Sequence, residues 1–360
     1  MIMEKTDFNK PYIIAETAYN HEGDFDYIIK MINEIADLKL DAVKYHLLLN
    51  INSYITIDHP LSDKVQDWLF TENQWDEILN YSKAKNLDII ALCDDVESVK
   101  FIKKKHGNIY AVEVHSTSIN DFFLLKEVAT FKGKIILGIG GTSLDEIQYA
   151  INFLNKNGKN DIILMYGFQS YPTDYNDINL KKIIKIRNLF NVPIGYADHT
   201  DYNDPNNEII SILALMMGIN IIEKHFTLNP GEKRIDNKAA VSKKQMIKIK
   251  ELMDLVYTIR GNGAIEMSDD EKAYGNTGPM KKAIVARCPI MKGEKIKLDK
   301  IWFKRTDRES PVKQSQLPLL LGLKVIKDIK TDEIIDFNKV EYNFKKYDSR
   351  TVGLNQKKGE

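Results

Sequence analysis

Short apolar segments recur at intervals through most of the chain. Eight of them have the composition of buried strands and begin near Tyr12, Asp41, Asp88, Tyr110, Lys134, Asp161, Val192 and Asn220. Amphipathic stretches such as DYIIKMINEIADL and LKKIIKIRNLF lie between them, with apolar positions at the period of a helix. This alternation predicts β/α units, and eight units in about 260 residues fit a (β/α)8 TIM barrel. A doubly wound open sheet is the alternative, but no G-x-G-x-x-G follows the first strand to favour a dinucleotide fold.

Three helix starts support this assignment. In each, a Ser or Thr precedes a periodic run and a Glu or Gln follows three residues later, which is the spacing of a capping box. The pairs are Thr71 and Gln74, Ser143 and Glu146, and Ser242 and Gln245.

The character of the sequence changes after the last predicted barrel helix, near Arg260. The stretch GNGAIEMSDDEKAYGNTGP is polar and glycine-bearing, as a linker would be. Beyond it the runs KAIVARCPI, IWFKR and DEIIDF are short, β-like and separated by polar residues. We therefore predict a barrel domain over residues 1–265, a linker over 266–280, a small mostly β domain over 281–344 and a polar tail over 345–360.

Composition narrows the class of protein. Hydrophobic residues make up 43% and charged residues 28%, as in globular proteins. Lys and Arg number 51, as do Asp and Glu, which argues against a dedicated nucleic-acid binder. No apolar run approaches the roughly 18 residues that cross a bilayer, and MIMEKTDFNK lacks a signal-peptide core, so we expect a cytoplasmic protein. Cys93 and Cys288 lie far apart, which disfavours a disulfide framework or a zinc ribbon.

Polar residues at the ends of the predicted strands are the first candidates for chemistry, because barrel active sites lie at the carboxyl ends of the strands. Glu16 ends the first strand, in IIAETAYNHEGD. Lys44 lies inside the second, in AVKYH, where a charge needs a partner or a polar cavity. A structural ion pair is the alternative explanation for Lys44.

Two histidines occupy matching positions on neighbouring strands. His199 in GYADHT follows the seventh strand and His225 in EKHFT follows the eighth. Both imidazoles would reach one rim, and two His with open coordination positions suit Mn2+, Fe2+, Co2+ or Zn2+. Each could instead be a hydrogen-bonded structural residue. Tyr171 in QSYPTD and Asp236 in GEKRID are weaker candidates, since singly a turn and an exposed loop charge explain them better.

Taken in order, the segments IIAETAYNHEGD, DAVKYH, NDFFLL, SYPTDYNDINL, GYADHT, IIEKHFT and KGEKI with IWFKR form a series that resembles the sialic acid synthase family. The resemblance covers almost the whole chain. It implies a barrel followed by a small antifreeze-like, or SAF, domain. It also implies condensation of phosphoenolpyruvate with an N-acetylated hexosamine-type aldehyde, which releases phosphate and forms a nonulosonic acid.

The resemblance assigns roles to the catalytic candidates. His199 and His225 would be the two protein ligands of a divalent metal, usually Mn2+ in this family. Glu16 would lie at the acceptor sugar, and Lys44 would meet the carboxylate of phosphoenolpyruvate. Together these four residues would form the catalytic set.

Further residues are implied to bind substrate. Tyr171 and Asp236 would lie around the hydroxyl and amide groups of the acceptor. Ser116 is retained from a donor-binding segment, and Gln169 stands where an Asn usually helps to hold phosphate. Arg305, in FKR, matches an SAF-domain arginine that reaches the active site of a partner subunit. The resemblance therefore implies a domain-swapped homodimer that acts on small molecules. The balanced charge and the lack of a membrane-length apolar run predict no nucleic-acid or membrane partner.

The departures from the family pattern gather on the donor side. Glu113, in VEVHS, replaces a donor-binding Lys, while Gly138 in GIGG and Ala197 in GYADHT replace two Ser, and His46 replaces a Gln. Reversing a charge beside a donor that carries carboxylate and phosphate is more than the loss of a hydrogen bond. Backbone N–H groups of the GIGG turn could compensate, as could positive charge on His46 and His115.

Three hypotheses for function remain open. The leading one is a divergent, metal-dependent synthase of a nonulosonic or related 2-keto-3-deoxy acid. The second is a metal-dependent aldolase or lyase that uses pyruvate, and the third is a noncatalytic barrel that binds a sugar acid. If Glu113 competes for Lys44, phosphoenolpyruvate should bind weakly. The alternative is that Glu113 points away and pairs with a surface cation.

Overall fold

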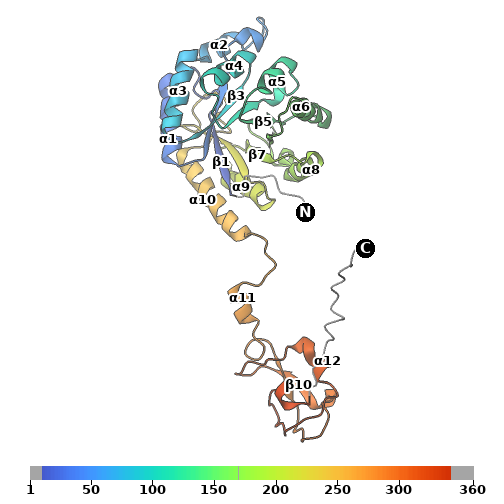
Figure 1. Cartoon of the computed structure of the whole chain (residues 1–360). Coiled ribbons are helices and arrows are strands. Elements are labelled where there is room, and N and C mark those ends of the chain that lie inside the picture. The colour runs from blue at the N-terminus through green and yellow to red at the C-terminus, as the bar shows by residue number, and fades with distance from the viewer. Residues whose placement is uncertain (1–9, 169, 342–360) are drawn as a thin grey trace, which may run out of the picture. The chain divides into compact units, whose positions relative to one another are not determined.

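The first part of the chain forms a closed barrel of eight parallel strands in the computed structural model, which describes residues 10–168 and 170–341 (Figure 1). The strands are β1 (Tyr12–Glu16), β2 (Ala42–Leu47), β3 (Asp88–Cys93), β4 (Ala111–Val114), β5 (Lys134–Gly138), β6 (Ile162–Tyr166), β7 (Ile194–Asp198) and β8 (Ile221–His225). Each begins within about two residues of its predicted start. The barrel closes where β1 pairs with β8, so the predicted (β/α)8 barrel is confirmed.

Helices connect the successive strands and cover the outside of the barrel. They are α1 (Phe25–Asp37), α2 (Ser62–Trp68), α3 (Glu72–Ala84), α4 (Val96–Lys105), α5 (Phe122–Val128), α6 (Leu144–Lys156), α7 (Tyr175–Ile178), α8 (Leu180–Phe190), α9 (Asn207–Met216) and α10 (Lys243–Arg260). All three predicted capping boxes form, at the starts of α3, α6 and α10. Local hydrogen bonds therefore begin these helices where the sequence pattern predicted.

Strand alternation separates two apolar clusters. Ile13 and Ala15 of β1 join the large cluster between the barrel and its helices, whereas Ile14 joins the smaller cluster inside the barrel. Strands buried on both faces read as continuous apolar runs, which is why their pattern does not alternate in the sequence. The same alternation turns Glu16 inward at the carboxyl end of β1, so polar chemistry starts where the inner apolar cluster ends.

The chain divides after Gly261 into two compact units. The second contains β9 (Ala283–Ala286) and β10 (Ile301–Lys304), which pair antiparallel, together with α12 (Leu317–Leu320) and an apolar core of its own. The stretch expected as a linker contains a short helix, α11 (Asp269–Tyr274), which a capping box starts. The tail predicted over 345–360 lies outside the described residues.

Among the described residues, no helix has both the length and the apolar character needed to cross a membrane.

Candidate active site

A pocket opens at the carboxyl ends of the barrel strands, and each of the eight strands contributes to its lining. Six of the residues singled out as site candidates line it: Glu16, Lys44, Tyr171, His199, His225 and Asp236. The pocket therefore brings together side chains from segments more than 200 residues apart in the sequence. Neighbouring parallel strands achieve this because their carboxyl ends meet at one rim.

Lys44 is the centre of charge in this pocket. Its Nζ lies 2.7 Å from Glu16 Oε2, 3.1 Å from Glu113 Oε1 and 2.9 Å from Glu223 Oε1. All four side chains are at least 95% buried. Glu113 thus points into the barrel, and the alternative of a surface ion pair is wrong for this residue. Burial lowers the pKa of Lys44, but the attraction of Glu113 and Glu223 outweighs it and raises that pKa above its ordinary value.

Three carboxylates around one ammonium leave an excess of negative charge. Burial raises the pKa of Glu113 to about 7, with Lys44 opposing the rise and Glu223 adding to it. Among the pocket residues that the structure describes, Lys44 is the only lysine or arginine. The cation that an anionic ligand would meet is therefore already shared among three acids.

His199 and His225 lie next to each other in the same lining, with ring centroids 5.1 Å apart. At metal–nitrogen bonds of ~2.1 Å and ligand angles of about 90–110°, two imidazole centroids lie roughly 4.5–5.3 Å apart. Burial lowers the pKa of His199 to about 3 and that of His225 well below its ordinary value. Both rings are therefore neutral at pH 7, as metal ligands must be.

The two histidines fit a metal with open positions. Within the described residues, no group of three or more His, Cys, Asp or Glu side chains forms a ligand set. An ion bound through His199 and His225 would take its other ligands from water or substrate. The ring of Tyr171 lies 5.0 Å from His199 and 5.6 Å from His225, edge to face, and so borders the same space.

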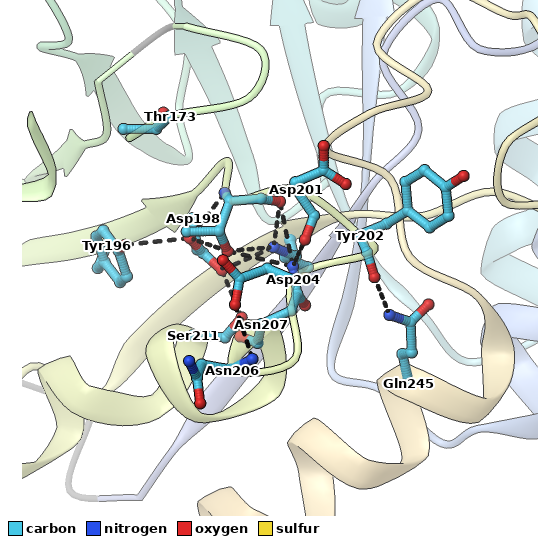
Figure 2. Close-up of polar contacts among 12 residues, drawn as sticks. Thr173, Tyr196, Asp198, Asp201, Tyr202, Asp204, Asn206, Asn207, Ser211 and Gln245 are labelled. Carbon is cyan, nitrogen blue, oxygen red and sulfur yellow. Dashed lines mark hydrogen bonds and ion pairs between the residues drawn. The ribbon is translucent and has the colours of Figure 1, made fainter. Parts of the chain in front are cut away.

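A buried ion pair on the outer face of the barrel holds these histidines in register. Asp198 and Lys224 are cross-strand partners on β7 and β8, with Oδ2 and Nζ 2.7 Å apart and both side chains fully buried. Figure 2 shows Asp198 surrounded by Tyr196 and Ser211, which donate hydrogen bonds to it together with Thr200. Although burial raises the pKa of Asp198, Lys224 brings it below its ordinary value.

The next residue along each strand, His199 or His225, lines the pocket instead of the outer face. The ion pair and the two imidazoles thus belong to consecutive residues of the same two strands, with the ion pair facing outward and the imidazoles facing inward. Asn207 of α9 adds to the outer network by donating to the backbone carbonyls of Thr200 and Asp201, as Figure 2 shows in part. The spacing of the histidines therefore depends on a hydrogen-bonded framework behind them.

His46 also lines the pocket, two residues after Lys44 on β2. Its Nδ1 lies 3.5 Å from Asp94 Oδ2, and its Nε2 lies 4.0 Å from Glu16 Oε1. Asp94 is buried and accepts a hydrogen bond of 2.8 Å from the hydroxyl of Tyr19. The ring of His115 lies 5.8 Å away, between centroids. Carboxylates thus flank both nitrogens of His46.

Two acidic residues of this site were missed in the sequence. Glu223 lies two residues before His225 on β8 and Asp94 directly follows β3, so strand alternation could have assigned Glu223 to the pocket. The position of Asp94 at a strand end was also a signal that could have selected it, as it selected His199. Both bear on the charge of the pocket more than several residues that were chosen.

The remaining candidates differ in what the structure says of them. Ser116 starts the turn after β4, and a side chain at Gly138 would lie only 3.1 Å from its amide nitrogen, so the glycine allows this close approach. Gln169 lies outside the described residues. Arg305 belongs to the second unit, where its Nε donates to the carbonyl of Pro279 at 2.7 Å.

Comparison with known proteins gives matches along most of the chain. An uncharacterised protein of Methanocaldococcus jannaschii is 29% identical over 325 residues, covering 90% of this chain and 93% of that protein. The N,N'-diacetyllegionaminic acid synthase of Campylobacter jejuni is 28% identical, covering 91% and 99%. The solved structure of N-acetylneuraminic acid (sialic acid) synthetase from Leptospira borgpetersenii superposes with a TM-score of 0.67 at 28% identity, covering 73% of this chain and 90% of that one.

Family matches divide along the two units. Residues 281–341 match the SAF domain, in the second unit. Residues 32–264 match the NeuB family, which is more than half of the chain and includes His199 and His225. Together with the barrel, these matches confirm the expected resemblance to sialic acid synthases: the chain belongs to the NeuB family.

Proposed function

We propose that this protein is a carbon–carbon bond-forming synthase. It joins a three-carbon donor, either phosphoenolpyruvate or pyruvate, to the aldehyde of an N-acetylated amino sugar, and the product is a nonulosonic or related 2-keto-3-deoxy acid. The observation that carries the proposal is one pocket in which two neutral imidazoles, His199 and His225, share the lining with Lys44. Relatives named as acid synthases support it.

The protein's own residues would divide the work between two substrates. Lys44 would pair with the donor carboxylate, with Ser116 and Gln169 on the donor side. Glu16, Tyr171 and Asp236 would hold the acceptor by hydrogen bonds, which fixes the aldehyde carbon next to the donor methylene. A divalent ion, with Mn2+ as the first candidate, would bind through the two histidines and polarise the acceptor carbonyl when present.

One observation favours pyruvate as the donor. Glu16, Glu113 and Glu223 already surround Lys44, so little positive charge is left for a phosphate. Phosphoenolpyruvate is the donor that the family resemblance implies, and its phosphate would leave after water adds at C2. The two donors give the same carbon skeleton, and release of inorganic phosphate distinguishes them.

We further propose that the protein acts as a homodimer in which Arg305 completes the pocket of a partner subunit. The resemblance of the FKR segment to the family's SAF domains supports this, as does the division of the chain into two compact units. The guanidinium of Arg305 would donate hydrogen bonds to the acceptor sugar, on the side of the pocket away from Lys44.

Replacing either histidine should remove the metal. His199→Ala and His225→Ala should each lose most of the Mn2+ that the native protein holds, because a single imidazole cannot supply two protein ligands. His115→Ala, which alters the same pocket but neither ligand, should keep it. Metal content of the dialysed proteins measures this, and full occupancy in both ligand variants would exclude the site.

Mixing two inactive variants should restore condensation if subunits share sites. Arg305→Ala and His199→Ala proteins, exchanged at random, form about half mixed dimers with one intact site each, so about a quarter of native activity should return. Product formation before and after mixing gives the readout. Native mass spectrometry would verify that subunits exchange, and verified exchange without recovery would contradict the sharing of Arg305.

The native protein should bind phosphoenolpyruvate weakly, and Glu113→Lys should strengthen binding at least about ten-fold because it reverses the charge beside Lys44. Glu113→Gln, which removes a charge without adding one, should give an intermediate affinity. Calorimetric titration with Mn2+ present measures all three. Tight binding by the native protein, or no gain in either folded variant, would refute the effect of Glu113.

A further inference from the structure

The charge of the pocket limits what the donor can carry. Phosphoenolpyruvate has close to three negative charges at neutral pH, about two of them on its phosphate, whereas pyruvate has one. Lys44 is the only lysine or arginine among the described lining residues, and its Nζ is within 3.1 Å of three carboxylates. Within the described barrel lining, a second anionic group placed beside Lys44 would meet carboxylates and no further lysine or arginine.

The backbone of the pocket can donate hydrogen bonds but supplies no full positive charge in place of the missing cation. In the GIGG turn after β5, the amide of Ile139 already donates to the carbonyl of Met165 at 2.9 Å. Gly138 carries no hydroxyl, and the nearest charged group to a side chain there would be Glu113, at 3.6 Å. The amide nitrogen of Ser116 lies nearer, at 3.1 Å, so a phosphate here would meet one backbone amide and the Glu113 carboxylate but no cation.

The pocket holds instead a group that a phosphate-free donor requires. Phosphoenolpyruvate is already an enol derivative, so its methylene carbon is nucleophilic as it stands. Pyruvate must first lose a proton from its methyl group, and this step needs a base. His46 lies two residues after Lys44 on β2 and faces the same pocket.

The surroundings of His46 suit it to this task. Asp94 Oδ2 lies 3.5 Å from its Nδ1, and Tyr19 fixes that carboxylate through a hydrogen bond of 2.8 Å. Because the Asp94 carboxylate lies beside Nδ1, the opposite nitrogen is the one that would accept the proton. The second nitrogen, Nε2, lies on the side of Glu16, toward Lys44.

We propose that the donor of this enzyme is pyruvate itself and that His46 is the base that removes a proton from its methyl carbon. The inference rests on the proposed function, in that it specifies the donor of the same condensation. It also explains Glu113, whose carboxylate would repel the phosphate of a phosphorylated donor near Lys44.

The steps balance without a further reactant. The C3–H bond of pyruvate breaks, its proton moves to His46, and its electron pair forms the enolate. C3 then bonds to the aldehyde carbon of the acceptor. The carbonyl electron pair of the aldehyde moves to its oxygen, which takes a proton back from the His46 imidazolium. The product is a 4-hydroxy-2-oxo acid, with no water consumed and no phosphate released.

Exchange of the methyl protons tests the proposal without an acceptor. In D2O with Mn2+, the native protein should incorporate deuterium into pyruvate, measured by mass spectrometry. His46→Gln, which keeps the size and polarity of the side chain, should slow exchange at least about 100-fold. Pyruvate affinity, measured by calorimetry, should change by less than about three-fold, because a base is not needed for binding.

His106→Gln is the matched control. His106 is buried and, like His46, pairs with a carboxylate, with Nε2 2.8 Å from Asp76 Oδ1. It follows α4 and precedes β4, at the opposite end of the barrel from the pocket. Its variant should keep native exchange.

Three results would overturn the inference. Exchange that survives in His46→Gln would exclude His46 as the base. Phosphate release from phosphoenolpyruvate with a panel of 2-acetamido sugars, at a higher kcat/KM than pyruvate turnover, would exclude pyruvate as the donor but leave the proposed condensation intact. The absence of exchange and of product with either donor would refute both the inference and the proposed function.

Discussion

The ammonium of Lys44, buried inside the barrel, is the constraint on which the rest of the site depends. A lone charge in this position would be prohibitively costly, so the inner lining must supply carboxylates. Glu16, Glu113 and Glu223 do so from β1, β4 and β8, and they bind together strands on different sides of the barrel. Because three acids face one cation, the contacts that allow the burial also leave the pocket acidic. Burial, together with the neighbouring Glu223, raises the pKa of Glu113 although Lys44 opposes the rise.

A second buried ion pair lies between the barrel and its helices, and it positions the histidines. Asp198 and Lys224 satisfy each other on the outer face of β7 and β8, away from any substrate. Since strand residues alternate between faces, this pair sets the position of the imidazoles that follow it. Lys44 and the histidines thus occupy one pocket for different reasons: an internal charge cluster holds the first, and an external framework holds the second.

The sequence predicted the barrel well because its strands are buried on both faces and its helices begin with local capping boxes. Glu16, Lys44, His199 and His225 could be placed in one pocket because topology alone brings strand ends together. Their chemical roles and the metal stay predictions. The orientation of Glu113 could not be decided, since one residue's shift in register would have turned it outward.

Other features depended on contacts that no local pattern contains. The distances of Glu223 to Lys44 and of Asp94 to His46 show how these two acids act on the site, which their positions on the strands do not reveal. Helix α11 was not predicted, because the stretch that contains it is polar, although Ser268 and Glu271 have capping-box spacing. Polar composition suggested a linker, and the short helix shows that composition and local hydrogen bonding can point in different directions.

The central claim is that the acid-rich surroundings of Lys44 select a donor without phosphate. The most direct measurement supplies uniformly 13C-labelled pyruvate and unlabelled phosphoenolpyruvate together, at equal concentration, with Mn2+ and a 2-acetamido sugar, and follows the mass of the condensation product. The account predicts a labelled product and no release of inorganic phosphate. An unlabelled product, formed with one phosphate released per molecule, would contradict it.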